Sequence, residues 1–247
     1  MDLSPIWISL RTAITATLIT FFVGITAAWF MAGYKGFFKG LIDGVLNLPL
    51  VLPPTVVGFF LLLLFGRNGP IGKVLMALGT SVIFSWPATV IAAFVVAFPL
   101  MYKTARGAFE QIDGNVISAA RTLGVSEWSI FWRITVPLAW PGIAAGTVLA
   151  FARALGEFGA TLMIAGNIPG KTQTIPVAIF FAAEGGEMDK AFLWVLLIVG
   201  ISLTAIMIMN YWSEVQRKFV TGGGRKKYGT FSGYKKEASG IQTGSEI

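Results

Sequence analysis

The chain of 247 residues contains no cysteine and no histidine. It therefore has no disulfide framework, no thiol nucleophile and no imidazole base. The same absence excludes metal sites built from cysteine or histidine, so we expect the chain to hold no metal ion. A membrane-embedded enzyme is one possible reading, but we find no plausible nucleophile–base pair for it.

Charged residues are also scarce. They make up 13% of the chain, whereas soluble domains carry roughly 25%. Hydrophobic residues make up 55%, and the mean hydropathy is +0.74. The composition therefore predicts an integral membrane protein and leaves no room for a soluble domain.

Five apolar runs are each long enough, at a rise of about 1.5 Å per residue, to cross a bilayer core of about 30 Å. They cover approximately residues 12–32, 45–65, 82–102, 141–164 and 191–212. The first run is longer than the apolar segment of a signal peptide and lacks a basic start, so we expect a retained helix. The fold class predicted for residues 1–220 is an all-α, polytopic bundle of about five transmembrane helices.

Lysine and arginine are concentrated in alternate loops. Two lysines follow the first run, four basic residues lie between the third and fourth runs, and seven follow the fifth run. Because positive residues mark the cytoplasmic side, the N-terminus is predicted to lie outside and the C-terminus in the cytoplasm of a cell-membrane protein. We accordingly read the net charge of +7 as a topology signal and expect no nucleic-acid partner.

Residues 221–247 form a tail rich in glycine, serine and lysine, with little apolar content. This composition predicts a disordered cytoplasmic end. The alternative is a polybasic patch that binds anionic membrane lipid beside the last span, with about 1 kcal/mol for each basic residue near the surface.

A polar stretch, SAARTLGVSEWSIFWRITVP (residues 118–137), separates the third and fourth runs. Its first helix is predicted to stop at Gly124, because glycine enters a left-handed cap at little cost. Ser126 is placed to cap a second short helix, with Glu127 in its first turn. Pro137 is predicted to end that unit. We therefore predict two short helices joined by a glycine hinge, within a cytoplasmic loop of about residues 103–140.

The second apolar run begins with a proline-rich segment, NLPLVLPPTVVGF (residues 47–59). Each proline lacks an amide proton, so nearby carbonyls lose their hydrogen-bond partners. One interpretation is a helix that begins only after Pro54, since prolines suit first turns. The other is a break that lines a wet cavity. Thr55 then lies at a helix start whose free amides can face an oxyanion in the transport pathway.

Two charges interrupt the fourth run. Arg153 and Glu157 are four residues apart, and Arg153 lies about 18 Å along a helix from Pro141, close to the bilayer midplane. An arginine at that depth costs roughly 2.5–3.5 kcal/mol, so it should face protein or water. One explanation is a mutual ion pair. The other, which we favour, is a role in the pathway or its gate, because intramembrane charges are usually functional.

Two glycine-containing patterns concern possible protein partners of this chain. Gly142 and Gly146 form a GxxxG motif, which indicates close helix packing or a dimer contact. Lys73 follows a glycine as in a P-loop, but Arg67 and Val74 occupy the positions that need glycine and serine or threonine. The nucleotide-binding motif is absent, so if ATP drives this protein, another chain hydrolyses it.

The polar stretch resembles the EAA loop of ABC-importer permeases, whose pattern is Glu-Ala-Ala, three residues, Gly, nine residues, Ile-x-Leu-Pro. The residues at the matching positions are Ala119, Ala120, Gly124, Ile134 and Pro137. Two positions depart, because Ser118 stands in place of the glutamate and Val136 in place of the leucine. The resemblance implies that this loop docks in a groove of a cytoplasmic ATPase subunit.

Longer segments are similar to molybdate ABC-transporter permeases, namely LPLVLPPTVVGFFLLLLFGRNGPIG, FARALGEFGAT and GNIPGKTQTIP. The resemblance covers roughly residues 7–212 and implies the transmembrane fold of type I importers, acting as a homodimer. It also implies two ATPase subunits, which use ATP and magnesium, and an extracytoplasmic molybdate-binding protein. This chain itself is expected to bind no cofactor.

Two alternatives are kept. Tungstate and sulfate permeases share the segment similar to FARALGEFGA, so either anion is an alternative cargo. A non-transporting membrane scaffold would explain the helices and the tail, but it would not explain the spaced cytoplasmic hinge.

Overall fold

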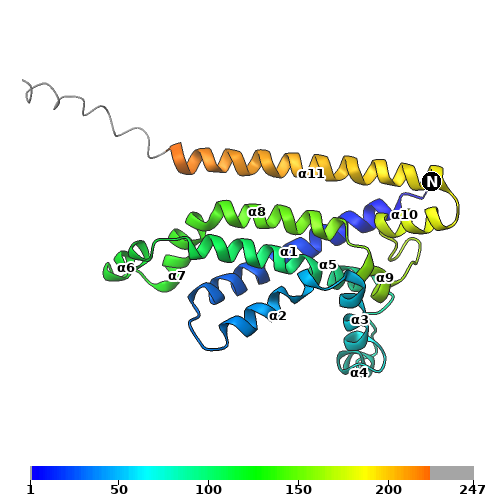
Figure 1. The fold of residues 1–247 in the computed structure, drawn as a ribbon, viewed down its shortest axis with the longest axis horizontal. Helices are drawn as coiled ribbons and strands as arrows, with labels where there is room; N and C mark the ends of the chain where they lie inside the picture. Colours follow the sequence, from blue (N-terminus) through cyan, green and yellow to red (C-terminus); the bar gives the residue numbers. More distant parts are fainter. Residues whose placement is uncertain (1, 223–247) are drawn as a thin grey trace, which may run out of the picture.

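A computed structural model describes residues 2–222, and the regular structure of these residues is helical, without strands. The elements, in chain order, are α1 (Ser4–Gly33), α2 (Lys39–Val51), α3 (Pro54–Phe65), α4 (Pro70–Ala77), α5 (Trp86–Glu110), α6 (Gly114–Thr122), α7 (Glu127–Ile130), the π-helix η1 (Phe131–Thr135), α8 (Val136–Leu155), α9 (Gly159–Ala165), α10 (Ile175–Glu184) and α11 (Met188–Gly222). Figure 1 shows that the long helices run alongside one another, with α6 and α7 at one end of the bundle.

The centre of the bundle is formed by α1, α5 and α8, which pack on one another. Many of the buried residues between them are small, such as Ala13, Ala97 and Ala150. Small residues let helix backbones approach closely. Close packing of this kind drives helix association in a membrane, because lipid is as apolar as the side chains and the hydrophobic effect between helices is absent. The α11 helix lies along α8 and is largely exposed on its apolar surface, as expected for a helix that faces lipid.

The GxxxG motif of α8 packs inside the chain. A Cβ atom at Gly146 would lie 2.9 Å from Met101 Sδ on α5, and one at Gly142 would collide with Ala108 on the same helix. Of the two uses considered for this motif, close helix packing is therefore the one that the structure shows.

The predicted bundle of about five transmembrane helices is confirmed. Four of the described helical segments are long and apolar enough to span a membrane, namely α1, α5, α11 and the segment from α7 to α8. The α2 and α3 helices make a fifth span if they are counted as one, bent by 113°. The third run extends further than predicted, because α5 continues to Glu110.

The second run is broken rather than continuous. α2 ends at Val51, and α3 begins at Pro54. Leu52 and Pro53 are both extended, with ψ of 141° and 137°, because a residue that precedes proline is driven out of the helical region. The helix start at Pro54 is confirmed, and the predicted break is present because another helix precedes it; that the break lines a wet cavity stays a prediction.

The fourth run, predicted as one helix over residues 141–164, is also broken, and that prediction was wrong. α8 ends at Leu155, and a separate short helix, α9, begins at Gly159. No proline lies in this break. α9 instead packs on α3, so close that a Cβ at Gly58 would lie 2.7 Å from the Cα of Ala160.

Pro137 does not end a helix, contrary to the prediction. It lies in the first turn of α8, and α7 runs into α8 through the π-helix η1. The amide of Val136 bonds to the carbonyl of Phe131, five residues back. This wider turn accommodates a proline, whose ring would otherwise meet the carbonyl four residues earlier.

Two features lie near the C-terminal end. α10 was not predicted, although its sequence IPVAIFFAAE is apolar and is followed by two glycines. The fifth run is confirmed within α11, which continues to Gly222. The predicted tail, residues 221–247, lies outside the described residues beyond that point.

Candidate functional site

The predicted glycine hinge is present between α6 and α7. The side chain of Asp113 caps α6 by accepting a hydrogen bond of 2.9 Å from the amide of Asn115. At the other end Gly124 has φ of +74°. Its amide bonds to the carbonyl of Arg121, and the amide of Val125 bonds to that of Ala120. These two bonds make a Schellman cap, in which glycine is favoured because its φ is positive.

The second short helix is α7, and its start is as predicted. The Ser126 hydroxyl accepts a long hydrogen bond of 3.4 Å from the amide of Ser129, and Glu127 lies in the first turn. Trp128 and Trp132 contact each other edge to face, with ring centroids 5.7 Å apart. Both are exposed, by 72% and 50%.

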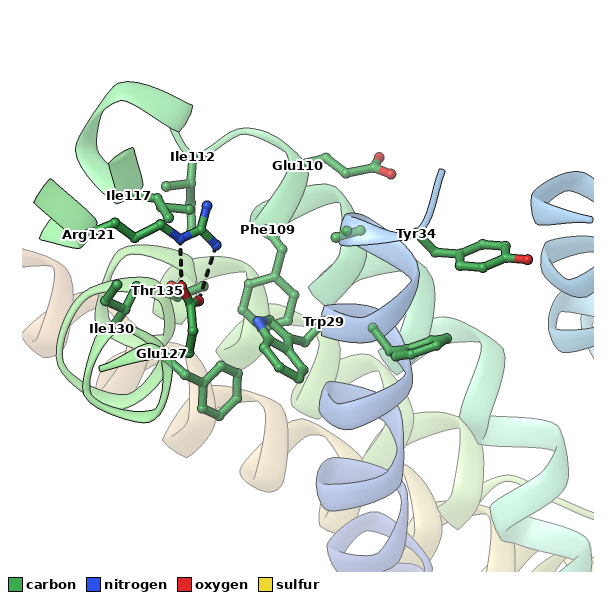
Figure 2. A pocket seen from close by; sticks show the side chains of 14 residues that line it. Trp29, Tyr34, Phe109, Glu110, Ile112, Ile117, Arg121, Glu127, Ile130 and Thr135 are labelled. Atoms are coloured by element: carbon green, nitrogen blue, oxygen red, sulfur yellow. Dashed lines mark hydrogen bonds and ion pairs between the residues drawn. The ribbon is translucent and has the colours of Figure 1, made fainter. Parts of the chain in front are cut away.

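An ion pair crosses the hinge. Nε and one terminal nitrogen of Arg121 donate to the two carboxylate oxygens of Glu127, at 2.6 Å and 3.1 Å. These hydrogen bonds raise the pKa of the Arg121 guanidinium. Figure 2 shows the two side chains joined between α6 and α7. The pair was not predicted, although opposite charges six residues apart across a helix-stopping glycine are a sequence signal for it.

The remaining predicted loop residues follow the same helices. Ser118 and Ala119 are exposed on α6, whereas Ala120 is buried. Ile134 lies in the π-helix, and Pro137 is exposed on α8. The structure thus places Ser118, Ala119 and Ala120 on α6. It places Ile134 and Pro137 on the helical segment formed by η1 and α8, which continues into the membrane span.

A cavity of about 580 Å³ lies behind the hinge. Figure 2 shows residues that line it, including Trp29 and Tyr34 near the end of α1, Phe109 and Glu110 at the end of α5, Arg121 in α6 and Ile130 in α7. The hinged loop and the ends of two core helices therefore share one cavity.

Arg153 and Glu157 form an ion pair at the break between α8 and α9. One terminal nitrogen of Arg153 lies 2.7 Å from Glu157 Oε2. The Glu157 side chain is 1% exposed and that of Arg153 is 28% exposed. The other carboxylate oxygen, Oε1, accepts a hydrogen bond of 2.7 Å from the amide of Ala160. Glu157 thus neutralises Arg153 and caps the first turn of α9.

Thr55 lies beside the same break. A Cβ added at Gly159 would be 3.2 Å from both the Cγ2 and the amide nitrogen of Thr55. The helix start that carries Thr55 and the interruption that contains Glu157 therefore come from two broken spans that meet. This meeting could not be predicted from the sequence, because the two segments are about 100 residues apart.

Among the described residues, no group of three or more histidine, cysteine, aspartate or glutamate side chains is arranged to hold a metal ion. The notable polar features of the described residues are ion pairs and helix caps.

Comparisons with known proteins agree with this arrangement. Residues 20–216 match the sequence model of a family described as "Binding-protein-dependent transport system inner membrane component". The molybdenum transport system permease protein ModB of Haemophilus influenzae is 44% identical over 221 residues, which make up 88% of this chain and 96% of that protein. ModB of Escherichia coli (strain K12) is 44% identical over 214 residues, which make up 85% and 93% of the two chains.

A solved structure shows the same fold. The bacterial ABC transporter involved in the import of the acidic polysaccharide alginate contains a chain that superposes with a TM-score of 0.72. The match covers 86% of this chain and 78% of that chain, at 16% identity. At this identity the likeness concerns the arrangement of helices alone.

Proposed function

The chain belongs to the family of binding-protein-dependent transport system inner membrane components, and from this membership we propose that it is the permease subunit of an ATP-driven importer of molybdate. The family is one of multi-pass membrane permeases rather than enzymes, and the fold is that of type I ABC importer transmembrane domains. The observation that carries the molybdate assignment is 44% identity across 96% of a protein named for molybdenum transport. Tungstate and sulfate are less favoured for the same reason.

The proposed assembly is a homodimer of this chain with two cytoplasmic ATPase subunits and an extracytoplasmic molybdate-binding protein. ATP and magnesium belong to the ATPase partner, because this chain has no P-loop. We propose that the hinged loop docks on that partner through Ser118, Ala119, Ala120, Gly124, Ile134 and Pro137. The geometry supports this role, because a capped, ion-paired hinge presents its helices as one unit at the end of the bundle.

We propose that the meeting point of the two broken spans belongs to the transport pathway or its gate. Irregular backbone is tolerated in a membrane where it is buried in protein or lines a cavity, and intramembrane charges are usually functional. Thr55, Arg153 and Glu157 gather at this point. The ion pair joins the two sides of the break, so a change of its partners would open a route there.

Uptake into vesicles tests the proposed function. The chain is reconstituted in liposomes with its ATPase, with ATP inside and the binding protein outside, and radiolabelled molybdate uptake is followed. We expect uptake that requires both ATP and the binding protein and that excess sulfate does not abolish. Accumulation of sulfate without molybdate would contradict the assignment.

The proposed orientation, with the hinged loop in the cytoplasm, is tested by thiol labelling. The chain has no native cysteine, so the background is clean. Lys171→Cys and Leu123→Cys each replace an exposed residue, one in the segment between α9 and α10 and one at the hinge. An impermeant reagent added to intact cells should label the first and not the second. The reverse pattern would contradict the orientation.

A further inference from the structure

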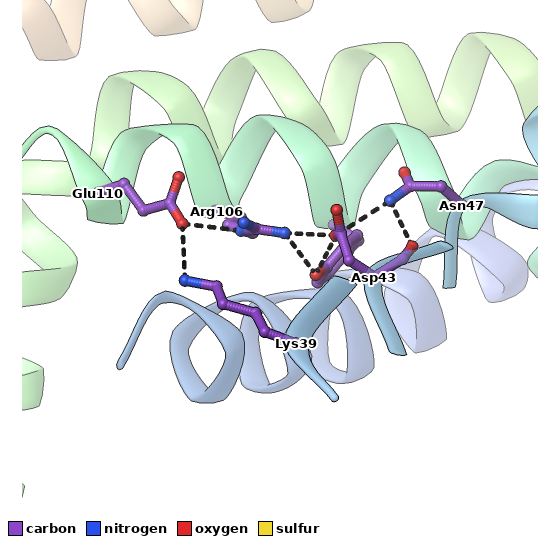
Figure 3. Close-up of polar contacts among 6 residues, drawn as sticks. Lys39, Asp43, Asn47, Arg106 and Glu110 are labelled. Atoms are coloured by element: carbon purple, nitrogen blue, oxygen red, sulfur yellow. Dashed lines mark hydrogen bonds and ion pairs between the residues drawn. The ribbon is translucent and has the colours of Figure 1, made fainter. Parts of the chain in front are cut away.

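A row of polar side chains joins α2 to α5. Lys39, Asp43 and Asn47 lie at four-residue intervals on α2, and Tyr102, Arg106 and Glu110 lie at the same interval on α5. Residues four apart share one face of a helix. The two faces meet in antiparallel order, and Figure 3 shows the contacts following one another between the helices. We call this row the α2–α5 polar ladder.

Arg106 is at the centre of the ladder. Its guanidinium forms an ion pair with Asp43 of α2 and donates to Glu110 of its own helix at 2.9 Å. It also donates to the Tyr102 hydroxyl at 3.2 Å, and that hydroxyl donates to Asp43 at 2.8 Å. Lys39 lies 3.6 Å from Glu110 at one end. The side chain of Arg106 is only 18% exposed, so water weakens these electrostatic contacts less than it would at the surface.

Apart from this ladder, α2 is weakly held. It has no buried residue, and its main apolar contribution to the core is the partly buried Leu46. Its successor α3 is held quite differently, by close backbone packing on α9 at Gly58. The break at Leu52 and Pro53 therefore joins a helix attached by polar contacts to a helix attached by tight packing. α2 is the element whose position depends most on a few side chains.

The ladder also ends at the hinged loop. Glu110, which Arg106 and Lys39 both contact, lines the same cavity as Arg121 and Glu127 of the hinge. Glu110 therefore belongs both to this end of the ladder and to the wall of the cavity behind the hinge. The last contact of the ladder joins Asn47 to Asp43, and beyond Asn47 the chain of α2 leads to the break at Leu52 and then to α3, which carries Thr55.

We propose that Arg106 and Asp43 are positioning residues for energy coupling, which hold α2 on α5 so that movement of the hinged loop reaches the broken spans. This inference rests on the proposed function, because coupling has meaning only in an ATP-driven transporter. In this proposal neither residue contacts the cargo. Their removal should leave ATP hydrolysis in place and separate it from transport.

The test measures molybdate uptake and ATP hydrolysis in the same reconstituted vesicles. Arg106→Gln should raise the ATP hydrolysed per molybdate at least about fivefold, within the usual range of coupling between sites. Asp43→Asn, which nearly preserves side-chain size, should act in the same direction. The double variant should be no worse than the more severe single variant, because either change alone already removes the contact between Arg106 and Asp43. Lys190→Gln is the matched control, since it removes an exposed ion pair with Glu187 outside the ladder.

A second readout does not require transport. Lys39→Cys and Glu110→Cys, joined by a short bifunctional thiol reagent, report how closely α2 lies to α5. The crosslinking yield should fall when Arg106→Gln is added to this pair. If wild-type vesicles took up no molybdate, the proposed function would fail, yet the yield would still show whether Arg106 positions α2.

Three results would overturn the proposal. One is an equal fall of uptake and hydrolysis in both single variants, which would indicate loss of folded protein only. Another is a double variant in which the two effects multiply. The third is an unchanged crosslinking yield. If Arg106→Gln does not accumulate in membranes, the ATP hydrolysed per molybdate and the crosslinking yield are both measured with Asp43→Asn instead.

Discussion

Two arginine–glutamate pairs in this protein have nearly the same shortest nitrogen–oxygen distance and very different surroundings. Nitrogen and oxygen are 2.7 Å apart in the pair of Arg153 and Glu157 and 2.6 Å apart in that of Arg121 and Glu127. The first carboxylate is 1% exposed, whereas the second is 61% exposed. Burial makes the loss of one partner costly, and exposure makes it cheap. The distance alone would have ranked the two pairs as equals.

The difference assigns them different roles. The buried pair holds a break between two helices, where a charge without its partner has no water to replace it. The exposed pair spans a glycine turn whose shape is already set by backbone hydrogen bonds. It adds stiffness to a surface that we propose to be a docking surface. The predictions that follow separate the two roles, beginning with the buried pair.

Arg153→Ala is expected to have the largest effect on stability. It leaves the Glu157 carboxylate buried without a cation, a change that costs about 3–5 kcal/mol in buried pairs. Because Arg153 is partly exposed, we expect a value near the lower end, about 3 kcal/mol. The thermal midpoint of the purified protein in detergent measures the loss. Combining it with Glu157→Gln should recover most of the stability, since the amide needs no cation and its oxygen can still accept from Ala160. A double variant as unstable as the single one would contradict this explanation.

Gly124→Val is expected to have a smaller effect on stability and a large effect on coupling. No atom lies within 4 Å of a Cβ added at Gly124, so the strain comes from its φ of +74°. A left-handed conformation costs a residue with a Cβ about 1–2 kcal/mol, and more when it is β-branched. We expect substrate-stimulated ATP hydrolysis to fall while membrane insertion persists. Gly124→Asn is the matched control, because asparagine tolerates this conformation. Normal stimulation in the valine variant would remove the hinge from the coupling surface.

Arg121→Gln is expected to have the smallest effect. The Schellman cap and Ser126 still define the turn without the ion pair. We expect a slightly reduced stimulation of ATP hydrolysis at low salt and no difference from the wild type at high salt, where exposed charges are screened. A salt titration of both proteins measures this. A defect as large as that of Gly124→Val, and independent of salt, would show that Arg121 itself contacts the partner.

The parts of the fold that were predicted from sequence are those decided by local chemistry. The apolar runs gave the membrane spans, and Gly124 with Ser126 gave the hinge, because caps depend on residues within one turn of each other. The break at Pro53 was partly predicted for the same reason, since proline acts on its immediate neighbours.

The parts that were missed depend on contacts distant in sequence. No proline marks the end of α8, and the break depends on Glu157 capping α9 while α9 packs on α3. The ladder joins Asp43 to Arg106, 63 residues apart. Pro137 was misread because a wider π-turn absorbs a proline that would end an ordinary helix. Single residues indicate a cap or a turn, but they do not indicate which helices will pack against each other.

The most direct test of the role assigned to the buried pair is molybdate uptake by Arg153→Gln combined with Glu157→Gln. This variant removes both charges without leaving either one unpaired, so folding and insertion should be retained. Uptake is normalised to the amount of dimer recovered from the membrane. If the pair belongs to the pathway or its gate, normalised uptake should fall far below that of the wild type. Uptake near the wild-type level would show that the pair only holds the helices together, and would remove Arg153 and Glu157 from the transport route.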